Sequence, residues 1–319
     1  MAPTAVVLLT MGEPESLREV RPFLRALLSD PHLVPFPVPA LQPVFAWAVS
    51  RLGGGRLRRC LAAIGGGSPL KRLTVLQGRA LEQALRPDGE FRVYAAMRYG
   101  QPSAADAARR LLADGARRVV ALPLYPQYCR ATTGSSLEDL RLRLKEQGAG
   151  LPVREVRSWP EHPGYVRALV RQVSAAVAQA PDGRAHLLFS AHGVPEAFIR
   201  SGDPYQCEVE RTVAALRCAF RGLPSSLCYQ GRTGRGRWLG PDAAVEAARL
   251  GRSGVKSLVV VPVSFVSDHS ETLFELDLAL RRTAEDAGVK TFLRVPALNS
   301  QPDFIAALRD LALDAEAAP

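Results

Sequence analysis

Short apolar runs alternate with helical repeats along almost the whole chain. Eight runs predict strands, at 5–11, 91–99, 117–125, 151–156, 185–192, 225–230, 255–265 and 290–297. Most of the segments between them carry apolar residues at helical spacing, as in SAADAARRLLADG and DAAVEAARLGRSG. This alternation predicts an α/β fold in which helices cover both faces of parallel sheets.

The two halves of the chain repeat each other. ADGARRVVALPLYP matches RSGVKSLVVVPVSF, so that Pro123 corresponds to Pro262, and MGEPESL matches HGVPEAF, so that Met11 corresponds to His192. We therefore predict two similar domains, each with a four-stranded sheet. They span 1–157 and 158–319, and the last helix could pack back on the first domain. Ligands of such folds bind beyond the carboxyl ends of the strands, where Met11 and His192 would face each other across a cleft.

One histidine and a row of carboxylates carry the candidate chemistry. The buried run in LLFSAHGVPEAF delivers His192 to the end of a sheet. SDHSETLFELD follows the most apolar strand and places Asp268, Glu271 and Glu275 at helical spacing on one face. An amphipathic helix with a solvated acidic face would show the same spacing. Its position after a central strand instead favours proton transfer and passage of a hard divalent cation.

Composition narrows the class of function. The net charge is +10, but the arginines are scattered and no nucleic-acid recognition motif occurs, so we expect no nucleic-acid partner. An acidic small molecule or an anionic membrane surface suits this charge. No apolar run approaches the ~20 residues of a membrane-spanning helix. The strand-like start AVVLLTM lacks the features of a signal peptide, which predicts a cytoplasmic location. Phosphate-loop, dinucleotide-binding and nucleophile-elbow motifs are absent.

The segment 33–50 is almost wholly apolar and holds four prolines, which disfavour one regular helix. Two interpretations remain open. The segment is either a buried connection or a hydrophobic lip that covers a ligand or contacts a membrane.

Together the motifs resemble the ferrochelatases, which insert ferrous iron into a porphyrin in the last step of haem synthesis. The resemblance runs in order through nearly the whole chain, in TMGEPES, IGGGSPL, MRY, YPQY with TTGSS, LFSAHGVP with GDPY, WLGP and SDHSETLFELD. It implies a lyase with two chelatase-like domains, a porphyrin substrate, and Fe2+ as the second substrate.

The resemblance also assigns roles to residues. It implies that His192 accepts the inner N–H protons of the porphyrin and, with Glu271, contacts the iron. A histidine with an ordinary pKa of about 6.5 can act as a neutral base near pH 7. The other positions that match the family's porphyrin, proton or iron contacts are Met11, Ser68, Arg98, Tyr99, Trp238, Asp268, His269 and Glu275.

The chain departs from the family pattern at two points. Leu61 stands where animal members carry a tyrosine that helps to hold a propionate, and Arg56 or Arg58 could supply the charge instead. Met11 stands near the place where coproporphyrin-metallating relatives carry tyrosine, which favours protoporphyrin IX as substrate. A coproporphyrin ferrochelatase, a non-catalytic porphyrin or haem carrier, and a cobalt chelatase are the alternatives. The intact histidine and glutamate speak against a carrier.

The cysteines number five: Cys60, Cys129, Cys207, Cys218 and Cys228. Some ferrochelatases carry a [2Fe–2S] cluster with one ligand before TTGSS, and here Cys129 lies one residue earlier than that ligand, whose place is held by Arg130. The resemblance thus implies a cluster held by Cys129, Cys207, Cys218 and Cys228, four thiolates as such clusters require. Cys60 would be spare or would replace Cys129. The other interpretation is that all five are unrelated small core residues.

Overall fold

The computed structural model describes residues 3–34, 38–181, 184–232 and 236–317. The chain divides into two compact units: unit 1 contains Met1–Ser158 and Asn299–Pro319, and unit 2 contains Trp159–Leu298. The division thus lies next to the expected boundary after residue 157, and the last helix belongs to unit 1.

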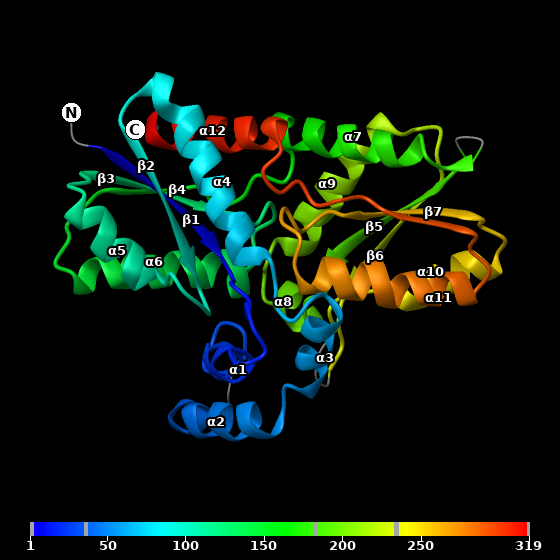
Figure 1. The fold of residues 1–319 in the computed structure, drawn as a ribbon, viewed down its shortest axis with the longest axis horizontal. Helices are drawn as coiled ribbons and strands as arrows, with labels where there is room; N and C mark the ends of the chain where they lie inside the picture. The colour runs from blue at the N-terminus through cyan, green and yellow to red at the C-terminus, as the bar shows by residue number, and fades with distance from the viewer. Residues whose placement is uncertain (1–2, 35–37, 182–183, 233–235, 318–319) are drawn as a thin grey trace. The chain divides into compact units, whose positions relative to one another are not determined.

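Unit 1 is built on a parallel sheet with the strand order β2-β1-β3-β4 (Figure 1). Its strands are β1 (Thr4–Thr10), β2 (Phe91–Met97), β3 (Arg118–Pro123) and β4 (Val153–Glu155). Its helices are α1 (Val20–Leu28), η1 (Pro39–Leu41), α2 (Gln42–Leu52), α3 (Gly55–Ala63), α4 (Leu70–Leu85), η2 (Arg86–Asp88), α5 (Ala104–Ala113), η3 (Arg130–Gly134), α6 (Ser135–Glu146) and α12 (Pro302–Ala317). Alternate residues of β1 share one apolar core with α5 and α6. Helices α4 and α12 pack on each other and on the strands at the opposite face.

Unit 2 repeats this plan with the strand order β6-β5-β7-β8. Its strands are β5 (His186–His192), β6 (Ser225–Gln230), β7 (Ser257–Pro262) and β8 (Thr291–Arg294). Its helices are α7 (Pro163–Val177), α8 (Glu196–Arg200), α9 (Tyr205–Ala219), α10 (Ala243–Arg252), η5 (Glu271–Leu280) and α11 (Arg281–Asp286). Helices α10, α11 and η5 share a core with one face of the sheet, and α7 packs on β7 and α9.

The strand registers confirm the internal repeat. Leu9 of β1 pairs with Pro123 of β3, and Ser190 of β5 pairs with Pro262 of β7. Met11 and His192 each lie two residues beyond these pairs, so they hold equivalent places in the two sheets. All eight predicted strands and the α/β fold are confirmed, because central parallel strands are apolar on both faces and stand out in a sequence.

In the described part of the chain, no helix combines the length and the apolar character needed to cross a bilayer. The cytoplasmic location stays a prediction.

Candidate active site

His192 is the last residue of β5 and lies at the carboxyl end of the sheet in unit 2. Its backbone N–H donates to Ser264 Oγ at 2.8 Å, and its carbonyl oxygen accepts from the Tyr205 hydroxyl at 2.8 Å. The imidazole is 36% exposed although the strand before it is buried. The histidine is therefore held firmly at its backbone while its ring stays accessible.

His192 and Glu271 form a close pair. His192 Nδ1 lies 2.7 Å from Glu271 Oε2. An ionised carboxylate only accepts hydrogen bonds, so this contact assigns the proton of the neutral ring to Nδ1 and leaves a lone pair on Nε2. Burial opposes the charged ring, but the charge of Glu271, its hydrogen bond and the charge of Glu275 outweigh that effect and raise the pKa of His192. The pair can thus take up and hold a proton.

Glu271 begins a π-helix, η5, where an α-helical spacing was predicted. Its backbone carbonyl accepts from Gln230 Nε2 at 3.3 Å, and Gln230 Oε1 accepts from the buried Ser190 hydroxyl at 2.8 Å. Glu275 lies four residues further, close to one turn of a helix whose hydrogen bonds join i and i+5. The ends of β5 and β6 therefore support the first turn of the helix that carries both glutamates.

Asp268 lies before η5, so the predicted acidic face of one helix holds only Glu271 and Glu275. Asp268 Oδ1 accepts from the Thr272 hydroxyl at 3.0 Å and lies 2.9 Å from Arg294 Nη1. Arg294, the last residue of β8, also lies 2.7 Å from Asp277 of η5. Asp268 therefore helps Arg294 to anchor the π-helix to the sheet.

Arg294→Gln is expected to lower the free energy of unfolding by roughly 3 kcal/mol, because it removes the buried cation beside Asp268, while Asp277 keeps its contact with Arg281. Since the anchor of η5 loosens, kcat for a reaction at His192 should fall more than KM rises. Urea unfolding and steady-state kinetics measure both effects. The control is Arg282→Gln, which removes a largely exposed guanidinium 3.9 Å from Asp286. An unchanged urea midpoint in Arg294→Gln would contradict the anchoring role.

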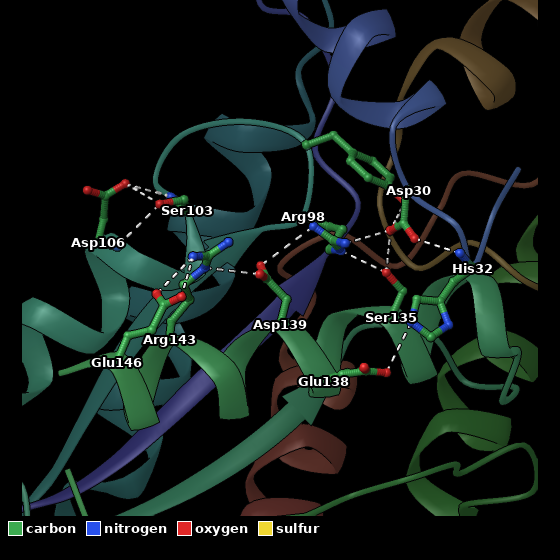
Figure 2. Close-up of polar contacts among 11 residues, drawn as sticks. Asp30, His32, Arg98, Ser103, Asp106, Ser135, Glu138, Asp139, Arg143 and Glu146 are labelled. Carbon is green, nitrogen blue, oxygen red and sulfur yellow. Dashed lines mark hydrogen bonds and ion pairs between the residues drawn. The ribbon is translucent and has the colours of Figure 1, made fainter. Parts of the chain in front are cut away.

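A second polar network lies in unit 1 around Arg98, which directly follows β2 (Figure 2). Arg98 Nη2 lies 2.7 Å from Asp30 Oδ2, and Arg98 Nε donates to Ser135 Oγ at 2.7 Å. Asp30 also accepts from the hydroxyls of Ser135 and Tyr99, at 2.6 and 2.8 Å. Asp139 of α6 lies on the other side of the guanidinium, at 3.7 Å.

The network keeps Asp30 ionised inside the unit. Burial would raise the pKa of Asp30, but the hydrogen bonds from Ser135 and Tyr99 and the charge of Arg98 lower it overall. Burial and the nearby Asp30 carboxylate in turn raise the pKa of Tyr99. The polar ends of Arg98 and Tyr99 are thus committed to Asp30. Arg98 keeps 21% of its side chain exposed for any further contact.

A profile of the Ferrochelatase family matches residues 3–316. The chain belongs to the ferrochelatase family. The ferrochelatase of Synechococcus sp. (strain RCC307) is 44% identical over 100% of this chain and 84% of its own length. That of Desulfotalea psychrophila is 39% identical over 98% of this chain and 97% of its own length. The activity of this family is porphyrin metallation, with Fe2+ as a substrate.

Two solved chelatase structures share the fold. SirB from Bacillus subtilis, solved with Fe3+, has a TM-score of 0.55 at 11% identity and covers 98% of this chain and 97% of its own. CbiX, described as the terminal enzyme of sirohaem biosynthesis in denitrifying bacteria, has a TM-score of 0.52 at 15% identity, covering 98% and 99%. Both likenesses concern the fold, which agrees with two chelatase-like sheets.

Ser68 of the ferrochelatase-like motif IGGGSPL lies in a tight, buried turn before α4. Its Oγ accepts from the Leu70 N–H at 3.3 Å, and its own N–H donates to the Pro14 carbonyl at 2.9 Å. A Cβ on Gly67 would lie 1.8 Å from the Glu15 carbonyl oxygen, so this position requires glycine. The motif thus brings two backbone segments together.

His269 and Trp238 lie around the His192 site in unit 2. His269 is buried, its Nδ1 lies 3.1 Å from the Ser267 carbonyl, and its ring centroid lies 4.7 Å from that of Phe265. The Phe265 ring also meets His192 edge-on at 6.1 Å. Trp238 is half-buried and lies near Gly193, directly after His192. Phe265 therefore packs against His192 directly, while His269 reaches His192 through Phe265.

The predicted [2Fe–2S] ligands do not come together. Among the described residues, which include all five cysteines, no group of three or more His, Cys, Asp or Glu side chains could hold a metal ion. Cys207 and Cys218 are exposed on one helix, α9, about 16 Å apart along its axis. Cys228 is buried in β6, and burial raises the pKa of its thiol to about 12. Cys129 is buried in unit 1. The prediction of a resident cluster is therefore corrected, because these residues do not fit one.

Several supporting residues were missed from the sequence. Gln230 ends β6 as His192 ends β5, so its position at a strand end could have identified it. Arg294 ends β8 and could have been identified in the same way, whereas Asp30 and Ser135 gave no such signal, because they are remote from each other in the sequence.

Proposed function

We propose that the chain inserts Fe2+ into protoporphyrin IX to form protohaem, with His192 as the base. The observation that carries this is the 2.7 Å contact between His192 Nδ1 and Glu271 Oε2 at an accessible strand end. Metallation replaces two inner N–H protons of the macrocycle by one metal ion. The lone pair of His192 Nε2 takes such a proton, and Glu271 stabilises the resulting imidazolium. Glu275 adds a second negative charge along the same helix, which favours onward proton transfer.

We also propose porphyrin contacts for residues of unit 1. Met11 is the strongest candidate, because its place in the sheet of unit 1 equals that of His192 in unit 2. The exposed part of Arg98 would contact a propionate. Tyr99 and Ser68, both buried, would act through packing. In unit 2, Trp238 would pack against the macrocycle. Asp268 would act by holding helix η5 in place, and His269 by holding the Phe265 ring beside His192.

The apolar side chain of Met11 supports protoporphyrin over coproporphyrin. Protoporphyrin carries two apolar vinyl groups where coproporphyrin carries two further propionates. A thioether offers a propionate no hydrogen-bond donor, but it packs well against a vinyl group.

A metallation assay with iron, cobalt and zinc against both porphyrins tests the proposal. We expect iron insertion with kcat/KM higher for protoporphyrin than for coproporphyrin. The reverse preference would identify a coproporphyrin ferrochelatase. Porphyrin binding without metallation would identify a carrier, and activity confined to cobalt would identify a cobalt chelatase.

We further propose that α2 forms an apolar lip that contacts porphyrin or membrane. The helix buries Gln42, Ala46 and Ser50, and Gln42 Nε2 donates to two backbone carbonyls at 3.0 Å. Its exposed side carries the larger apolar groups: Val44, Trp47 and Leu52 are 63%, 47% and 92% exposed. This inverted arrangement supports the lip over a buried connection. Phe36 of the same segment lies outside the described residues.

The variant Trp47→Ser with Leu52→Ser is expected to lower association with phosphatidylglycerol vesicles about tenfold or more per residue, since each burial stabilises by about 1.5–3 kcal/mol. Vesicle sedimentation measures binding to the membrane, and porphyrin fluorescence titration measures binding to porphyrin. The control, Leu142→Ser with Val245→Ser, removes exposed apolar groups from α6 and α10. Unchanged binding of both partners with a lowered unfolding temperature would show that these two side chains only stabilise the fold.

A further inference from the structure

A cavity of about 490 Å³ lies in unit 2 at the end of the sheet opposite to His192. Its lining comes from the segments that lead into all four strands, β5, β6, β7 and β8. His192 ends β5, whereas this cavity lies where β5 begins. The cavity therefore plays no part in the metallation chemistry derived above. Its volume falls in the ordinary range for small-molecule sites.

Three cations line this cavity: Arg184, Lys256 and Lys290. The N–H groups of Lys290 and Thr291 both donate to the Lys256 carbonyl, at 2.8 and 2.9 Å, so the two lysines precede neighbouring strands at the same level. No aspartate or glutamate is found among the described lining residues. Two of the four lysines of the chain thus precede neighbouring strands at this end of the sheet.

The equivalent end of unit 1 is arranged differently. Strand β3 holds the place in unit 1 that β7 holds in unit 2. Arg118, its first residue, lies 2.8 Å from Glu316 of α12, and Arg309 of the same helix pairs with Asp88 at 2.5 Å. Helix α12 thus supplies unit 1 with the carboxylate that the described cavity of unit 2 lacks.

We propose that this cavity binds the phosphoryl group of a small molecule. Lysine ammonium groups are compact charges that bind phosphate oxygens, and a guanidinium can add two parallel hydrogen bonds. The hydroxyl-bearing Ser257 and Thr291 lie in the same wall. The rest of the lining is mainly apolar, with Pro181, Leu223, Pro224 and Val255, and would contact the body of the ligand. A dissolved phosphate ester and a phospholipid headgroup share this chemistry.

Calorimetric titration of the full chain with pyrophosphate, in phosphate-free buffer at low salt, tests the site. We expect saturable binding that Lys256→Gln with Lys290→Gln weakens about 100-fold, because each charge-assisted hydrogen bond contributes about tenfold. The control, Lys145→Gln with Arg282→Gln, removes the same charge from α6 and α11 and should leave the affinity unchanged. Absence of saturable binding by the unaltered chain, or equal affinity in the lysine variant, would overturn the proposal.

A second pair of titrations distinguishes the two sources of the phosphoryl group. Glycerol 3-phosphate represents a dissolved ester, and dihexanoyl phosphatidylglycerol below its micellar concentration represents a lipid. If the lipid binds more tightly than glycerol 3-phosphate and the lysine variant loses this binding, the cavity is a headgroup site. If the two ligands bind with equal affinity and the lysine variant loses both, the cavity is a site for dissolved esters. Insensitivity of both to the lysine substitutions counts against the site. Iron insertion, assayed without phosphate, should be unchanged in the lysine variant, so this test is independent of the metallation proposal.

Discussion

His192→Ala is expected to lower the rate of iron insertion by about 10²–10⁴-fold, the usual contribution of a positioned general base. The backbone of His192 is held by Ser264 and Tyr205, which do not depend on the imidazole. The fold should therefore persist, and porphyrin binding should change little. Single-turnover metallation with ferrous iron under anaerobic conditions measures the loss.

The matched control is His186→Ala, which removes an imidazole from the opposite end of the same strand. It should insert iron at close to the unaltered rate. Circular dichroism and porphyrin fluorescence titration confirm that each variant is folded and binds substrate. Near-normal insertion by His192→Ala would remove this histidine from the role of base.

Glu271→Gln is expected to lower activity about 10–100-fold, the usual effect of losing the carboxylate that orients a functional histidine. The substitution keeps the shape of the side chain but removes the charge that raises the pKa of His192. That pKa should therefore fall. Because only the neutral ring accepts a proton, the acid limb of the kcat/KM profile should move to lower pH while the maximum rate drops.

Glu271→Asp serves as the charge-conserving control, in which the acid limb should stay closer to its original position. An acid limb that does not move in Glu271→Gln would show that the carboxylate does not set the pKa of the base. The raised pKa of His192 also makes the free energy of unfolding depend on pH. A raised pKa in the folded state means that protonated His192 stabilises the fold below the pKa of the unfolded chain. This contribution is lost as the pH rises through the folded pKa.

The two units show how one scaffold has taken on different chemistry. Both contain a π-helix after the equivalent strand, η3 after β3 and η5 after β7. At the spacing that relates Pro123 to Pro262, Thr132 of η3 corresponds to Glu271 of η5. The pair of His192 and Glu271 therefore lies in unit 2. In unit 1, the residue that follows β2, Arg98, belongs instead to the hydrogen-bonded network around Asp30.

Much of the fold could be predicted from the sequence because its signals are local. Buried parallel strands appear as short apolar runs, and the repeated segments set the order of elements in both units. The same signals placed His192 at the end of one strand and Glu271 in the helix that follows another, and the carboxyl ends of parallel strands lie at the same edge of a sheet. The motifs of the ferrochelatase family were also readable in order along the chain.

Tertiary structure alone decided how these groups are held. Helical spacing placed Asp268 beside Glu271, but the helix begins only after Asp268, which pairs instead with Arg294 on a later strand. Cysteine number and a family pattern suggested a cluster, yet Cys207 and Cys218 lie about three turns apart on α9 and Cys228 is buried in β6, so the thiols do not converge. Arg98 was identified as a substrate contact, but its main partner is Asp30, far away in the sequence. Local patterns specify which residues reach the end of a sheet, whereas contacts between remote segments depend on packing that no local pattern records.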